Sequence, residues 1–179
     1  MAVLSATVAK VHLNIKTGDN DDEVEVAVKA AESAIAERVG PLEPTEVTAR
    51  VGGYVMALRL PVTPAISLTS VTPVGGTALT PSDLYLAADA GLVTYGSGEG
   101  FAEAFYDVVY QAGRAACPDD LLMAVKELVR HMWSTQRGGS QRPGSQPSDA
   151  LSNSLPGSAY TFPFRVEQLI APHLQALVA

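Results

Sequence analysis

The feature that most constrains the fold is a regular spacing of apolar residues between positions 21 and 39. Val24, Val28 and Ile35 belong to a series that recurs at steps of three and four residues, which is the period of one helix face. Acidic residues favour the start of this helix, and the Gly-Pro pair at 40–41 ends it. A helix with one apolar face must bury it, so the chain has to supply a second packing surface.

A second long helix is predicted after Pro118, which suits the first helical position and is followed by two aspartates. Its apolar stripe is broad and extends to Arg137, where the Gly-Gly pair at 138–139 ends the pattern. We expect this helix to pack on the helix at 21–39. The residues that we assign to these helix faces, as core or as contacts between subunits, are Val24, Val28, Ile35, Val125, Leu128, Met132 and Trp133.

The stretch between the two helices has the character of strands and turns. Short runs rich in Val, Leu, Thr and Tyr alternate there with prolines and glycines. The predicted strands are 46–51, 54–60, 66–72, 84–87, 92–95 and 103–111. Six short strands of this kind suggest a small antiparallel sandwich or barrel. The predicted fold class is therefore α+β, a helical bundle of two long helices plus short terminal helices, with an inserted small antiparallel β-domain.

The chain divides into four regions on this basis. Residues 1–44 and 114–138 form the helical core, and residues 45–113 form the inserted β-rich domain. Residues 139–158 are dominated by Gly, Ser, Gln and Pro, which predicts a flexible loop. Residues 159–179 carry aromatic and aliphatic side chains after that loop. This segment either docks on a partner or folds back onto its own bundle, and the sequence leaves both open.

Composition and charge limit the classes of function. Apolar residues make up 47% of the 179-residue chain and charged residues 17%, which is enough for a buried core. The net charge is −7 and no basic cluster offsets it, so binding to DNA through its phosphates is disfavoured. Cys117 is the only cysteine, which excludes an intrachain disulfide. No apolar run has the length of a membrane span or a signal peptide, so we expect a protein used without export or membrane contact.

No motif in the sequence predicts a metal site, a cofactor or a catalytic centre. Asp19, Asp21 and Glu23 imitate the first ligands of a calcium-binding loop, but Val24 replaces its turn glycine and Ala30 its bidentate glutamate. The three histidines share no metal-ligand spacing, and no motif completes a reactive site around the cysteine. We therefore expect a protein that is not an enzyme.

Four segments of the chain resemble phage head-tail connector proteins in their order and spacing. They are VAKVHLNIKTGDNDD at 8–22, AVKAAESAIAERVG at 27–40, YDVVYQAGRAACPDDLLMAVKELVRHMWSTQRG at 106–138, and FPFRVEQLIAPH at 162–173. On these segments the chain is identified as similar to the head-tail connector (adaptor) proteins of long-tailed bacteriophages. The strand-rich stretch from 45 to 111 is longer than in the smallest members of that family.

The resemblance implies a structural virion protein in the neck of the particle, assembled in the host cytoplasm. Such subunits form a ring, usually of twelve, below the portal protein, where they extend the DNA channel and provide the platform for the neck and tail. The implied partners are further copies of the same chain, the portal protein, and a head-closure (stopper) or tail-terminator protein. Genomic DNA would pass without specific binding.

The resemblance also assigns roles to residues by position. The C-terminal segment of family members commonly reaches the portal, which implies docking by Tyr160, Phe162, Phe164, Arg165, Val166, Leu169 and Ile170. An acidic channel wall would let DNA slide, and the possible lumen-facing acids are Asp19, Asp21, Asp22 and Glu23. Alternatives are another neck protein (a head-closure or tail-terminator subunit), and from other classes a small cytosolic enzyme or a glycan-binding module.

Overall fold

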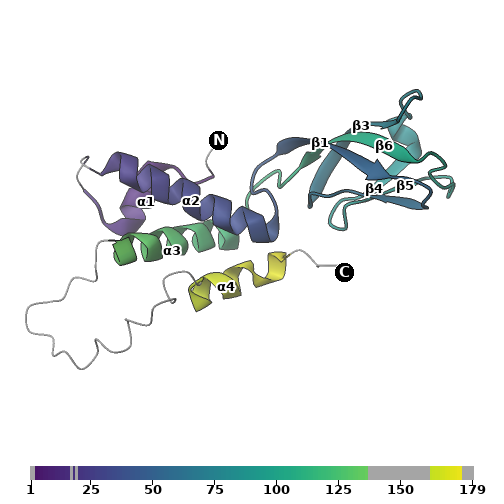
Figure 1. Cartoon of the computed structure of the whole chain (residues 1–179). Helices are drawn as coiled ribbons and strands as arrows, with labels where there is room; N and C mark the ends of the chain where they lie inside the picture. Colours follow the sequence, from purple (N-terminus) through teal and green to yellow (C-terminus); the bar gives the residue numbers. More distant parts are fainter. Residues whose placement is uncertain (1–2, 17, 19, 137–161, 175–179) are drawn as a thin grey trace, which may run out of the picture. The chain divides into compact units, whose positions relative to one another are not determined.

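The computed structural model describes residues 3–16, 18, 20–136 and 162–174, and its fold is α+β (Figure 1). The predicted flexible loop at 139–158 lies outside these residues. The chain divides into two compact units. The described part of the β unit comprises residues 36–117, and that of the helical unit comprises residues 3–16, 18, 20–35, 118–136 and 162–174. None of the described helices combines the length and the apolar character that crossing a membrane requires.

The described residues of the helical unit form four α-helices. These are α1 (Ala6–Leu13), α2 (Asp21–Val39), whose last turn belongs to the β unit, α3 (Asp119–Gln136), and α4 (Phe164–Ile170) with the short η4 (Ala171–His173) after it. The two long helices, α2 and α3, begin and end within one or two residues of the sequence prediction, because caps and turns mark the ends of helices. Helix α1, for example, starts where the Ser5 hydroxyl accepts a hydrogen bond from the backbone N–H of Val8.

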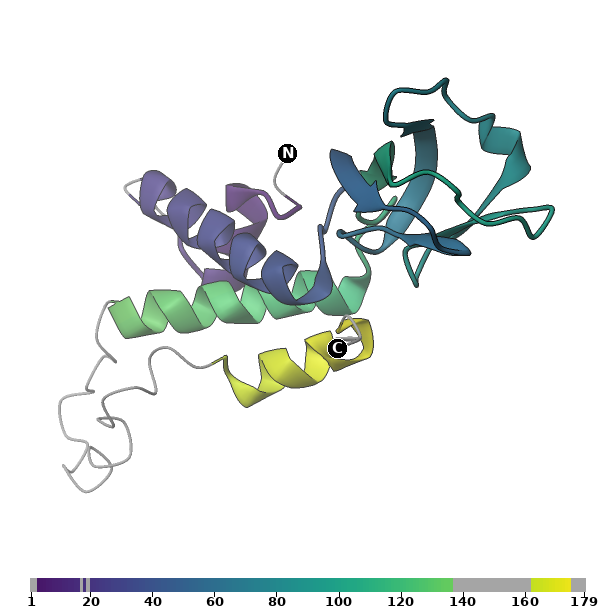
Figure 2. The same ribbon diagram turned by 45° about the vertical axis from the view of Figure 1, so that its right-hand side comes forward.

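The predicted packing of the two long helices on each other is not confirmed. Both long helices are present, but α3 makes its closest backbone contacts with α4 and α1, and the predicted bundle of α3 with α2 is not confirmed. Figures 1 and 2 show α4, in yellow, lying alongside α3, in green. The apolar stripe of α3 is broad enough for short helices to cover it. The stripe by itself could not show which helices those would be.

The β unit consists of two three-stranded antiparallel sheets, with strand orders β1-β6-β3 and β2-β5-β4. The strands are β1 (Thr45–Gly52), β2 (Ala57–Arg59), β3 (Ala65–Pro73), β4 (Leu84–Ala87), β5 (Leu92–Tyr95) and β6 (Phe105–Ala112), and a short η1 (Pro81–Asp83) precedes β4. The prediction of six short antiparallel strands is thus confirmed, and only β2 is markedly shorter than the predicted run.

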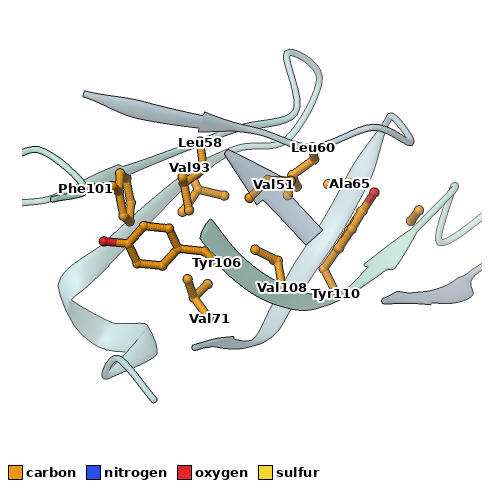
Figure 3. Close-up of a cluster of buried hydrophobic side chains, with 11 residues drawn as sticks. Val51, Leu58, Leu60, Ala65, Val71, Val93, Phe101, Tyr106, Val108 and Tyr110 are labelled. Carbon is orange, nitrogen blue, oxygen red and sulfur yellow. The ribbon is translucent and has the colours of Figure 1, made fainter. Parts of the chain in front are cut away.

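The core of the β unit is organised around β6, which pairs on both sides (Figure 3). Its residues alternate along the strand, and Tyr106, Val108 and Tyr110 point into the core. Residues from both sheets complete this core, including Leu58 and Val93. The hydroxyl of Tyr110 donates to the carbonyl of Val62 at 3.1 Å and accepts from its N–H at 3.0 Å, so this buried aromatic residue leaves no polar atom without a partner.

The chain enters and leaves the β unit at adjacent points, because Thr45 at the start of β1 pairs with Ala112 at the end of β6. Gly113 follows with a φ of 105°, and a Cβ atom there would lie 2.1 Å from the carbonyl oxygen of Glu43. The guanidinium of Arg114 donates to the carbonyls of Val39 and Pro41, at 3.0 and 3.3 Å. These contacts tie the two connecting segments together.

Substitution Gly113→Ala should therefore destabilise the β unit by at least about 2 kcal/mol, through backbone strain and the clash with Glu43. The matched control is Gly52→Ala, whose added Cβ meets no atom within 4 Å. The control should change the free energy of unfolding by less than about 0.5 kcal/mol. Chemical denaturation of both variants measures this, and equal stabilities would contradict the role assigned to Gly113.

Candidate assembly surfaces

Helix α4 lies on α3 through a small apolar contact. Val166 and Ile170, four residues apart on one face of α4, are buried, and α3 is the helix that α4 contacts most closely. On α3, Leu121, Val125 and Leu128 are also buried. We call the face of α3 that receives α4 the α4 seat. A two-turn helix has little stability alone, so α4 depends on this seat for its conformation.

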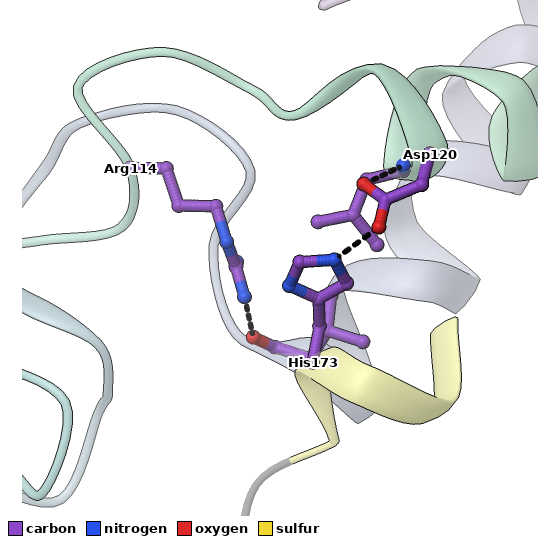
Figure 4. Close-up of polar contacts among 5 residues, drawn as sticks. Arg114, Asp120 and His173 are labelled. Atoms are coloured by element: carbon purple, nitrogen blue, oxygen red, sulfur yellow. Dashed lines mark hydrogen bonds and ion pairs between the residues drawn. The ribbon is translucent and has the colours of Figure 1, made fainter. Parts of the chain in front are cut away.

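A polar contact closes one end of the seat. His173 Nε2 lies 2.6 Å from Oδ2 of Asp120, in the first turn of α3 (Figure 4). An ionised carboxylate can only accept hydrogen bonds, so the imidazole is the donor. This bond, opposed by partial burial, holds the pKa of Asp120 below its ordinary value, and the backbone N–H of Leu121 donates to the other carboxylate oxygen at 2.8 Å.

A weaker ion pair shows the direction in which α4 runs. Arg165 Nη1 lies 3.8 Å from Oε1 of Glu127, near the middle of α3, whereas His173 reaches Asp120 at its start. Helix α4 therefore runs antiparallel to α3. The side chain of Arg165 is 68% exposed, so this ion pair contributes little to stability.

The residues predicted to dock on the portal differ in their exposure. Phe164, 73% exposed, and Arg165 face solvent. Val166 and Ile170 are buried in the subunit, whereas Phe162 and Leu169 are half-buried. Tyr160 lies outside the described residues. The segment thus folds back onto its own unit, and only part of it is accessible to another protein in this conformation.

The predicted helix faces lie mostly in the interior of the subunit. Five of the seven residues are buried, namely Val24, Val28, Ile35, Val125 and Leu128, and the other two, Met132 and Trp133, are half-buried. They therefore serve as core here. The apolar side chains of α1 and α2 that face solvent are different ones, Val8, Val11 and Val26.

The predicted lumen-facing acids gather at the start of α2. Asp21, Asp22 and Glu23 are exposed in its first turn, where they complement the positive end of the helix dipole. Asp21 also forms an ion pair with Lys10 of α1, so this carboxylate has a structural partner within the subunit. Asp19 lies outside the described residues.

Sequence reasoning missed an exposed apolar tip on the β unit, made by Tyr54, Val55, Met56 and Phe105. Two backbone hydrogen bonds hold it together, from Gly53 to Ala104 and from Phe101 to Val55, each 2.8 Å long. The run at 54–60 predicted a strand, but Tyr54 has a φ of 56°, outside the strand region. The Gly-Gly pair at 52–53 was the one sign of a break.

The contact between Asp120 and His173 was also missed. The two residues are 53 positions apart, and no periodicity or motif connects them. Among the described residues, no group of three or more His, Cys, Asp or Glu side chains could hold a metal ion. The described contacts of the helical unit are apolar packing surfaces and polar contacts that hold the helices in place.

The sequence model of the head completion protein family matches residues 2–144, which is most of the chain. This chain belongs to the head completion protein family. The assignment agrees with the likeness to neck proteins of the head-tail connector type that the sequence suggested. No curated protein matches this head completion protein.

Solved structures of gene transfer agent (GTA) particles contain chains with the same fold as this head completion protein. One chain, from the neck of an empty particle computed with C6 symmetry, has a TM-score of 0.68 and 18% sequence identity, covering 99% of this chain and 92% of that chain. A chain from the native virion gives the same values. A third, from the neck of a native particle computed with C12 symmetry, has a TM-score of 0.59 and 17% identity, covering 100% and 94%.

Because Ile170 is buried on the seat, Ile170→Ala should release α4 at a cost of about 2–4 kcal/mol in docking free energy. Hydrogen exchange should then become faster at the amides of α4 and unchanged in β6. Phe164→Ala is the matched control, since that side chain is exposed on the same helix. Equal protection of α4 in both variants would rule out the seat as described.

The lowered pKa of Asp120 predicts that acid weakens the docking of α4. The contribution is complete above the ordinary carboxyl value, about 3.9, and is lost as the pH falls through the lower folded value. An NMR titration of the Ile170 methyl group from pH 6 to pH 2, in wild type and in Asp120→Asn, measures it. The wild type should show an acidic step that the variant lacks, and identical curves would refute the assignment.

Proposed function

We propose that this head completion protein is a structural neck protein of a phage-like virion, and within the neck the adaptor that forms a ring directly below the portal. The supporting observation is its fold. The α+β subunit matches, over nearly its whole length, chains in the necks of GTA particles. The buried residues of the helical unit are apolar, and this packing suits a structural part.

The symmetry of those particles supports a ring of twelve. A ring of twelve subunits obeys both the C12 and the C6 symmetry under which the similar chains were found, whereas a ring of six obeys only C6. Self-association into a twelve-membered ring is therefore our proposal. A head-closure or tail-terminator role is the alternative within the same neck.

Docking on the portal is proposed for the exposed side of the C-terminal segment. Exposed aromatic and arginine side chains are the residue types that most often anchor protein interfaces, and Phe164 and Arg165 provide one of each. Val166, Leu169 and Ile170 would then keep α4 in shape on its seat. The acidic start of α2, with Asp21, Asp22 and Glu23, is proposed to face the channel, where like charge keeps DNA from adhering. A map of the ring with a channel lined mainly by arginines would refute that placement.

The test is to mix the purified protein with purified portal protein and to measure the assembly by mass photometry. A complex whose mass adds twelve copies to the portal is expected. Phe164→Ala should weaken the complex at least about tenfold, or about 1.4 kcal/mol. Tyr85→Ala, which removes a similarly exposed aromatic side chain from the β unit, is the control and should have no effect. A portal that binds neither the wild type nor the control would contradict the adaptor role.

A further inference from the structure

The length of the connection between α3 and α4 exceeds what their packing requires. Glu127 marks the point of α3 that Arg165 reaches, and α3 continues to Gln136. At 1.5 Å per residue, the chain leaving α3 has to return about 14 Å to start α4. About five residues in extended conformation would cover that distance. The sequence places residues 137–161 between the described helices, and these could span roughly 80 Å when fully extended.

The contact between α4 and α3 is small, and it could form between two molecules as well as within one. The contact includes two buried side chains of α4, Val166 and Ile170, a hydrogen bond between His173 of η4 and Asp120, and the ion pair to Glu127. None of these contacts depends on α3 and α4 belonging to the same molecule. The same seat on a neighbouring copy would receive α4 equally well, provided that the connection reaches it.

We propose that α4 is exchanged between neighbouring subunits, so that the α4 of one copy occupies the α4 seat of the next. The occupant of the seat in the assembly is thus the segment Phe164–Ile170 with η4 of a second copy. Each subunit then gives its helix at one side and receives one at the other, which is the head-to-tail contact that closes a ring. This inference rests on the ring assembly proposed above.

The exchange also leaves the seat of a free subunit filled by its own α4 before assembly. In a dilute solution the connection keeps α4 at a high effective concentration near its own seat, so the closed form with Val166 and Ile170 buried is favoured. When subunits are gathered in a ring, the neighbour's seat is present at a comparable effective concentration. The exchange requires no new kind of contact, because α4 makes the same contacts with the α3 of the neighbour as with its own α3.

The ion pair between Arg165 and Glu127 supplies a probe of the exchange. In an Arg165→Lys variant, a carbodiimide can join the new amine to the carboxylate of Glu127 as an amide, whereas the wild-type arginine does not react and serves as the control. Equal amounts of ¹⁴N- and ¹⁵N-labelled variant are mixed, assembled with portal, cross-linked and digested. The cross-linked peptides are then identified by mass spectrometry.

A dilute sample without portal should give only same-isotope cross-links, which confirms the closed subunit. Assembled rings should give mixed-isotope peptides as often as same-isotope ones. Rings that contain only same-isotope peptides would overturn the exchange and leave the adaptor role intact. Failure of the wild-type protein to form a ring with portal, seen by mass photometry, would overturn the adaptor role and the exchange within it. A dilute sample without any cross-link would contradict the seat itself.

Discussion

The apolar face of α3 is the constraint on which the rest of the helical unit depends. It is too broad for a single neighbour, and α4 and α1 lie along it. Each of these helices is too short to be stable in isolation, so their order follows from packing on α3. Helix α3 therefore belongs to the interior of the subunit and also forms the candidate assembly surface.

This dependence explains why α4 combines two properties that seem opposed. Val166 and Ile170 are as buried as core residues, whereas Phe164 in the same helix is largely exposed. A helix that is attached by one face and presents the other can be a folded part of the subunit and also a contact for another protein. The Asp120 and His173 pair fixes its position along α3 at little cost in burial, since both side chains remain partly in contact with solvent.

The β unit is organised by a different principle. Its core forms between two small sheets, with β6 at the centre of one of them and with tyrosines whose hydroxyl groups bind backbone atoms. The chain enters and leaves through adjacent segments that Gly113 and Arg114 hold together. An insertion with its own core and close ends can be added to a helical framework without disturbing it. That arrangement is consistent with a head completion protein in which a β-rich domain interrupts a helical core.

Local rules of helix and strand formation account for most of the elements that the sequence predicted. The spacing of Val24, Val28 and Ile35 specified α2, Pro118 and its aspartates specified the start of α3, and alternation with turn residues specified the six strands. Only the tertiary structure decided which helices pair with α3, that Val166 and Ile170 are buried while Phe164 is exposed, and that Asp120 meets His173. Those outcomes depend on contacts between residues far apart in the chain. An apolar stripe indicates that a packing partner exists, but it does not indicate which segment provides that partner.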